Sequence, residues 1–255
     1  YVHSRSRLTL VALLGLPLLA FGLALFQDYG TAEDFQRLNI GGEDDGAILA
    51  QAHRGIIQSA LLETSFLHAT SVADLPWIRL LAVFLAGLTG LALWQILERG
   101  GWAVWDAAAA GVCVSLLPSV QVIVGWATAW PVLLATLLSL AGFAAVESEL
   151  ERGGLKRFVG MLGGVMLYAC ASLVNFPSAL FGVVPLAGLL LVRPRRLWAE
   201  HQKWLLLHGL ILVVGVLAGW AFERRLLDDV GLLASMQGVD YVGRVQGFLT
   251  RGLAL

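Results

Sequence analysis

Apolar runs long enough to cross a bilayer are the feature that most constrains how this chain can fold. The hydrocarbon core of a bilayer is about 30 Å thick, so a spanning helix needs roughly 20 mostly apolar residues at a rise of about 1.5 Å each. About seven runs reach or approach this length, at residues 8–26, 77–97, 102–117, 126–146, 158–174, 179–192 and 204–222. A hydrophobic fraction of 58% and a mean hydropathy of +0.78 are too high for a soluble domain. The sequence therefore predicts an all-α, polytopic transmembrane bundle of about seven helices.

The runs and their connections form one predicted membrane domain over residues 1–255. Its main parts outside the bilayer are expected to be a long loop, residues 27–76, and a C-terminal extramembrane or interfacial tail, residues 223–255. Basic residues precede the first run as in a signal peptide, but the run is too long for one and no small-x-small cleavage pattern precedes Gln27. The first run is therefore predicted to remain as an anchor, and either end can continue into a longer protein.

The distribution of basic residues predicts the orientation in the membrane. Lysines and arginines near span ends bias a loop to stay in the cytoplasm. With the N-terminus inside, the inner loops carry Arg5, Arg7, Arg99, Arg152, Lys156, Arg157, Arg193, Arg195, Arg196 and Lys203. The outer loops carry only Arg37 and Arg54 before the tail. We therefore expect an integral protein of a bacterial inner membrane with a cytoplasmic N-terminus and a periplasmic or extracellular loop 27–76.

The first outer loop contains a predicted amphipathic helix. Asp44 or Asp45, followed by Gly46, is a plausible N-cap. Apolar residues then recur every four positions, at Ile48, Ala52, Ile56 and Ala60, while Gln51, Arg54 and Gln58 fall on the opposite face. This pattern is typical of a helix that lies in the membrane interface. One interpretation is a purely structural lid over the spans, and the other is one wall of a functional cavity.

The loop is also rich in carboxylates. Asp28 stands two residues beyond the first run, where the bilayer should end, and from there it could act as a general base on a membrane-bound substrate. His53 and Arg54 are the nearest candidates to hold a negatively charged phosphate. Alternatively, Asp28 only marks the membrane boundary with a solvated charge.

Further acids of the loop are expected to be solvated or to cap helices, namely Glu33, Asp34, Glu43, Asp44 and Asp45. As a cluster they could bind a divalent cation, which prefers several oxygen ligands. Their spacing matches no calcium-loop pattern, so no metal site is assigned.

Ionisable residues inside the runs are given structural interpretations. Arg79, in the first turn of the second run, is expected to extend to the lipid headgroups as an anchor. Asp106 should reach the cytoplasmic boundary in the same way, and His208 is expected to make a hydrogen bond between helices.

Residues 116–131 form an apolar strip that contains two prolines, Pro118 and Pro131. Because proline lacks an amide proton and disfavours helix in the residue before it, the helix should break near Leu117 and again near Trp130. A broken helix at membrane depth usually lines a cavity or packs on protein. We therefore predict an outward-opening cavity bounded by Asp28, His53, Arg54 and residues 118–130, with Gln121 and Trp126 among its substrate-binding residues.

Four features together resemble the GT-C class of membrane glycosyltransferases: an inside N-terminus, an acid directly after the first span, a long first outer loop with an interfacial helix, and a Pro-initiated break before Trp126-Ala127-Thr128-Ala129-Trp130-Pro131. The run Leu75-Pro76-Trp77-Ile78-Arg79-Leu80-Leu81 is also similar to theirs. The resemblance covers about residues 1–150. It implies transfer of a sugar from a polyprenyl-phosphate donor on the outer face, with Asp28 as the base and Asp34 or Glu33 as substitutes. Many members carry adjacent acids at this point, whereas Tyr29 follows Asp28 here.

Two other classes of function fit the composition. A transporter or flippase would carry internal repeats and paired polar residues near the middle of its spans, but the sequence shows no convincing repeat and its span centres are almost purely aliphatic. A non-enzymatic assembly subunit would explain the scarcity of polar residues outside the first loop. Besides a lipid-linked sugar donor, membrane lipid is the expected partner, and nothing resembles a nucleic-acid-binding module.

Overall fold

The computed structural model describes residues 2–26, 29–31, 34–35, 38, 56–66, 69, 71–150, 154–192 and 198–229, and these residues are helical apart from short turns and connections. The long helices are α1 (Val2–Phe26), α5 (Leu75–Arg99), α8 (Trp130–Leu150), α9 (Leu155–Val174) and α12 (Trp198–Asp229). The shorter elements are α4 (Ile56–Phe66), η1 (Val72–Asp74), α6 (Val104–Ser115), α7 (Pro118–Gly125), α10 (Phe176–Ala179), η2 (Leu180–Gly182) and α11 (Val183–Val192). The all-α prediction is confirmed.

Five of these helices are long and apolar enough to cross a membrane, and the bent pair of α6 and α7 makes up to six. The chain is therefore a polytopic membrane protein, but the described part has five to six candidate spans rather than about seven. The difference lies in the sixth predicted run, because residues Phe176–Val192 form only a shorter apolar helix. Its length is limited by a break at Asn175, whose side chain caps α10 by accepting a hydrogen bond from the Ser178 amide at 3.1 Å.

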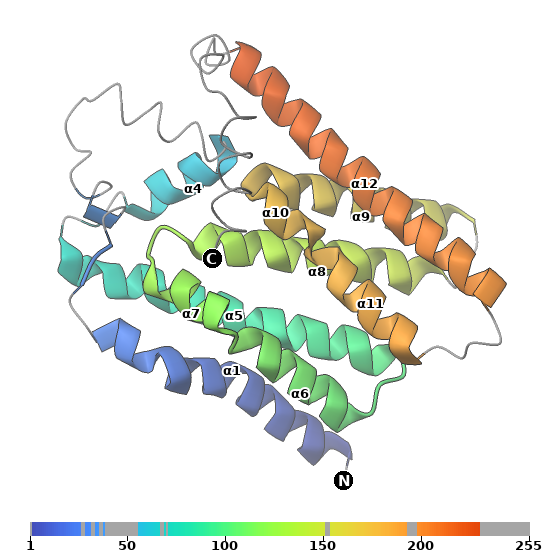
Figure 1. The fold of residues 1–255 in the computed structure, drawn as a ribbon, viewed down its shortest axis with the longest axis horizontal. Helices are drawn as coiled ribbons and strands as arrows, with labels where there is room; N and C mark the ends of the chain where they lie inside the picture. Colours follow the sequence, from blue (N-terminus) through green and yellow to red (C-terminus); the bar gives the residue numbers. More distant parts are fainter. Residues whose placement is uncertain are drawn as a thin grey trace, which may run out of the picture.

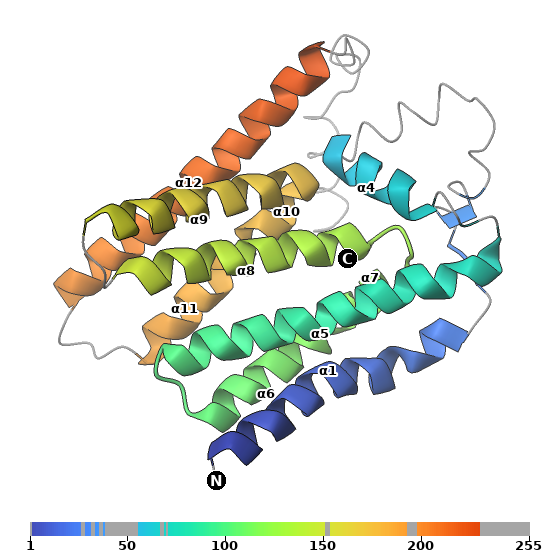
Figure 2. The same ribbon diagram turned by 180° about the vertical axis from the view of Figure 1, so that it is seen from behind.

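The long helices lie side by side in the order α1, α5, α8, α9 and α12, with each neighbouring pair in contact (Figure 1). Helix α6 packs against α1 and α5, and α4 contacts α8 and α9. Figure 2 shows the start of α1, the end of α5 and the starts of α6 and α9 at one end of the bundle, with α4 at the other end. The basic residues Arg99, Lys156 and Arg157 therefore belong to the end opposite α4, in keeping with the predicted orientation.

The break predicted between the third and fourth runs is confirmed. Helix α6 ends at Ser115, α7 begins at Pro118, and the two axes differ by 46°. The chain leaves the helical path again at Trp126, which has an extended backbone, and α8 begins at Trp130 next to Pro131. Proline is accepted in the first turn of each new helix because an amide there has no intrahelical partner.

The end of the bundle near α4 has its own hydrophobic core. Leu62 and Phe66 of α4 pack there with Phe21 of α1, Ile78 of α5 and Trp130 of α8. Gln58 was predicted on the polar face of the loop helix, but it is only 6% exposed.

The reason is the position of α4 against α8 and α9. Residues 58, 62 and 66 lie on one face of a helix, so the face that buries Leu62 and Phe66 also buries Gln58. Residues 39–55, with the predicted start of this helix, lie outside the described residues.

Helices α5 and α6 approach so closely that their backbones touch at two glycines. A Cβ added at Gly111 would lie 2.5 Å from the carbonyl oxygen of Gly90, and one added at Gly90 would lie 2.7 Å from the carbonyl oxygen of Gly111. Small residues permit such close packing of membrane helices.

We expect Gly111→Val to lower the free energy of unfolding by about 1–3 kcal/mol, because the backbones must separate to admit the side chain. The measurement is the unfolding midpoint in detergent. Gly15→Val is the matched control, since a Cβ added at Gly15 meets nothing within 4 Å. Equal midpoints for the two variants would contradict the close contact.

Candidate functional site

A buried arginine organises the end of the bundle near α4. Arg79 is the fifth residue of α5 and is 0% exposed. Its Nη1 donates a hydrogen bond to the carbonyl oxygen of Ala24 at 3.3 Å, and its Nη2 donates to the carbonyl oxygen of Tyr29. The guanidinium carbon also lies 4.0 Å from the centre of the Tyr29 ring. The interpretation of Arg79 as a headgroup anchor is therefore wrong, because these contacts turn its side chain inward.

Asp34 is the negatively charged partner of Arg79 in a buried ion pair. It is 0% exposed, and its Oδ2 lies 3.9 Å from Nη2 of Arg79. Its Oδ1 accepts a hydrogen bond from the amide of Thr128 at 3.2 Å. Since Thr128 belongs to the turn between α7 and α8, one carboxylate joins the first loop, the start of α5 and the broken helix.

Local sequence explains how Asp34 is held. The amide of Asp34 donates to Oγ1 of Thr31 at 3.3 Å, and the amide of Thr31 donates to Oδ2 of Asp34 at 2.9 Å. This reciprocal pair is a capping box, formed by a threonine and an acid three residues later. Ser71 and Asp74 form a similar box just before α5, with the Ser71 amide 2.9 Å from Oδ2 of Asp74. Capping boxes therefore fix both ends of the first loop.

Tyr29 packs between α5 and the broken helix. The guanidinium of Arg79 covers the Tyr29 ring. The Tyr29 hydroxyl lies 3.1 Å from the position that a Cβ added at Gly125, the last residue of α7, would take. The Tyr29 side chain and the Asp34 carboxylate thus both attach the first loop to α5 and to the broken helix.

The structure locates three of the seven predicted site residues. Asp34 lies in the buried centre, whereas Gln121 is exposed on α7 and Trp126 is 42% exposed at its end. The other four lie outside the described residues, namely Asp28, Glu33, His53 and Arg54. The predicted outward-opening cavity depends on three of these four and stays a prediction.

Sequence reasoning missed Arg79, Tyr29 and Thr128 as members of this centre. One usable signal was the Thr31-to-Asp34 spacing, which matches a capping box. The other was the cost of placing an arginine inside an apolar run, which favours a buried partner. Within the described ranges, no three His, Cys, Asp or Glu residues lie close enough together to hold a metal ion.

A second polar cluster, around the buried His208, lies at the other end of the bundle. His208 of α12 is 2% exposed, and its Nε2 lies 2.9 Å from Oε2 of Glu147 on α8. The indole nitrogen of Trp204 donates to the same oxygen at 2.7 Å, and the Phe143 ring stacks on the imidazole with centroids 4.6 Å apart. The prediction that His208 makes a hydrogen bond between helices is confirmed.

The buried centre that Asp34 and Arg79 form is thus a structural junction between three parts of the chain, at the end of the bundle that bears the first loop. Comparison with protein-family models, with curated proteins and with solved structures finds no match for this chain.

Proposed function

We propose that this membrane protein is a glycosyltransferase of the GT-C type, which moves a sugar from a polyprenyl-phosphate carrier to an acceptor on the non-cytoplasmic face. The observation that carries the proposal is the burial of Asp34 between Arg79 and Thr128. A loop that merely shields the ends of the spans has no need of a fully buried ion pair, which is expensive to desolvate. A loop that must present a reacting group at a fixed position does need such an attachment.

In this proposal Asp34 is a positioning residue. Its oxygens accept hydrogen bonds from Thr31 and Thr128, and its side chain is 0% exposed, so an acceptor hydroxyl has no path to it. The base is then Asp28, with Glu33 as its substitute. Tyr29, the neighbour of Asp28 in sequence, is held by Arg79 through both its carbonyl and its ring.

The remaining roles follow from charge and exposure. His53 and Arg54 would hold the phosphate, and Gln121 and Trp126 would face the substrates from the broken helix. During transfer the bond between the anomeric carbon and the phosphate oxygen breaks, and the acceptor oxygen bonds to that carbon. The acceptor proton passes to the loop carboxylate, and polyprenyl phosphate leaves.

A transporter is the second candidate, favoured by the contact of the buried His208 with the partly exposed Glu147. Paired ionisable residues within membrane helices often mark ion or proton pathways. The pair lies near the end of α8 and joins it to α12, so a single polar contact between two helices is the simpler account.

The test is to incubate the purified protein with a panel of polyprenyl-phosphate sugars, labelled in the sugar, together with membrane extracts that supply acceptors. The proposal expects release of polyprenyl phosphate and label in a new glycoside. Intact donor that has crossed the bilayer of a proteoliposome would instead support the transporter. If every donor of the panel stays intact and does not cross the bilayer, the proposal is overturned.

The positioning role of Asp34 makes a separate prediction. Asp34→Asn should lower kcat by about 10–100-fold, because a small misplacement of the loop moves the base away from its substrate. KM for the donor should change much less. Glu63→Gln, at an exposed acid of α4, is the control and should keep both constants. A proportional loss of folded protein with unchanged kcat per folded molecule would show that Asp34 only stabilises the fold.

A further inference from the structure

A groove lies between α8 and α9, at the end of the bundle opposite the centre of Asp34 and Arg79. Its volume is about 370 Å³. It is lined by Ala145, Ser148 and Glu149 of α8 and by Leu155, Lys156, Val159, Gly160 and Gly163 of α9. Leu155 and Val159 are both exposed, so the groove faces the surroundings of the bundle rather than its core.

The lining changes in polarity along the helix axis. The polar residues Ser148, Glu149 and Lys156 lie in the last turn of α8 and the first turn of α9, next to the connection between the helices. From there towards Gly163 the lining is apolar or glycine over about 10 Å, since each helical residue rises about 1.5 Å. A phospholipid has the same gradient, with a polar head at the membrane boundary and an acyl chain towards the middle.

Glycines create the apolar part of this groove. A Cβ added at Gly163 meets no atom within 4 Å, so the space beside α9 is open at this depth. At Gly160 an added Cβ would lie 2.5 Å from the Cβ of Glu149, which shows that the helices close up there. The groove can therefore take a slender chain beside Gly163.

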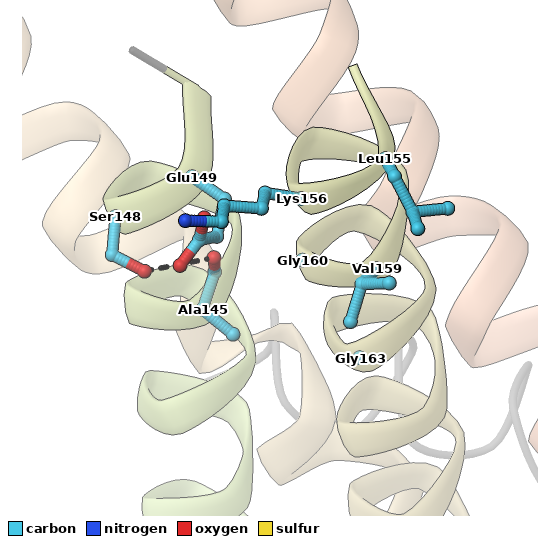
Figure 3. A pocket seen from close by; sticks show the side chains of 8 residues that line it. All are labelled: Ala145, Ser148, Glu149, Leu155, Lys156, Val159, Gly160 and Gly163. Atoms are coloured by element: carbon cyan, nitrogen blue, oxygen red, sulfur yellow. Dashed lines mark hydrogen bonds between the residues drawn. The ribbon is translucent and has the colours of Figure 1, made fainter. Parts of the chain in front are cut away.

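The end of the groove next to the connection between α8 and α9 carries one positive and one negative side chain, Lys156 and Glu149. Figure 3 shows the Lys156 side chain extending from α9 towards the Glu149 carboxylate on α8, with Ser148 beside it. Ser148 donates its hydroxyl proton to the carbonyl of Ala145 at 3.1 Å, which leaves its oxygen as an acceptor. The groove thus offers an ammonium to a phosphate, and a carboxylate and a hydroxyl oxygen to an amine.

We propose that this groove binds a phospholipid with a phosphoethanolamine headgroup, its phosphate on Lys156, its ammonium on Glu149 and Ser148, and one acyl chain along Gly163. A phosphocholine head lacks the N–H donors, and a phosphoglycerol head lacks the cation and meets the Glu149 carboxylate with a net negative charge. This site is independent of the proposed sugar transfer.

The experiment measures lipids that the purified full-length protein retains from detergent micelles, by native mass spectrometry. Phosphatidylethanolamine, phosphatidylcholine and phosphatidylglycerol with identical acyl chains are the probes. The wild type should retain phosphatidylethanolamine about tenfold more strongly than the other two, the size expected of a hydrogen bond to a charged group. Equal retention of all three lipids would overturn the proposal.

Variants of the residues proposed to bind the headgroup, Lys156 and Glu149, test the location of the site. Lys156→Gln should abolish the selective retention, whereas Arg157→Gln is the matched control, because Arg157 is the exposed neighbour that does not line the groove. Glu149→Gln should remove the preference over phosphatidylglycerol. Equal effects of Lys156→Gln and Arg157→Gln would mean that surface charge alone attracts the lipid, and would overturn the site.

A further variant leaves the headgroup residues intact. Gly163→Leu should fill the open space and prevent retention of phosphatidylethanolamine. Gly209→Leu on α12 is its control, because a Cβ added there also meets nothing within 4 Å. Retention by Gly163→Leu at the level of Gly209→Leu would show that the acyl chain does not lie in the groove.

Discussion

Arg79→Met should lower the free energy of unfolding by about 3–5 kcal/mol, the usual effect of removing one partner of a buried ion pair. The substitution keeps much of the apolar stem and removes the guanidinium. It leaves Asp34 buried without its cation and removes the hydrogen bonds to Ala24 and Tyr29. The first loop then loses its attachment to α5, so limited proteolysis should cut this loop in the variant before the rest of the chain unfolds.

The control for Arg79→Met is Arg99→Met, at the exposed cation that ends the same helix. A double-mutant cycle with Asp34→Asn adds a second check. The pair should show a coupling of about 0.5–3 kcal/mol, because the second substitution removes the charge that the first leaves uncompensated. Equal unfolding midpoints for Arg79→Met and Arg99→Met would show that the buried pair does not hold the loop.

Asp28→Asn should lower kcat of sugar transfer by about 10²–10⁴-fold, the range expected for the loss of a general base. The amide is nearly isosteric with the acid but cannot accept the proton of the acceptor hydroxyl. Because asparagine has nearly the size and shape of aspartate, the unfolding midpoint should stay near that of the wild type.

Glu33→Gln is the companion variant, since Glu33 is the substitute for Asp28. If Asp28→Asn keeps full turnover and Glu33→Gln loses it, the base is Glu33. Full turnover in both variants would exclude Asp28 and Glu33 as the base and would contradict the proposed mechanism.

Periodic and local signals predicted much of this fold. Long apolar runs located the five candidate spans, and Pro118 located the bend between α6 and α7. These features depend on residues close together in sequence, where hydropathy and proline geometry act directly. The sixth predicted run was misjudged because its apolar composition outweighed its short length: the helical segment that contains it begins only after the break at Asn175 and is too short to count as a span.

The candidate site was less predictable because its contacts join distant segments. Asp34 was one of several candidate acids, with capping among its expected roles, but its burial was not predicted. The rule that arginines near helix ends extend to headgroups gave the wrong surroundings for Arg79. Its partners, Tyr29 and Asp34, come from the other side of the long loop. Gln58 shows the same limitation, since its burial depends on where α4 packs and not on the pattern within α4.

The proposed transfer of a lipid-linked sugar takes place at the end of the bundle that bears the first loop. Its most direct test uses proteoliposomes of known protein orientation, with a labelled polyprenyl-phosphate sugar and its acceptor confined to one side at a time. The account predicts transfer when both are on the side of the first loop and none when both are on the side of the N-terminus. Transfer from the N-terminal side, or no transfer from either side by folded protein, would contradict it.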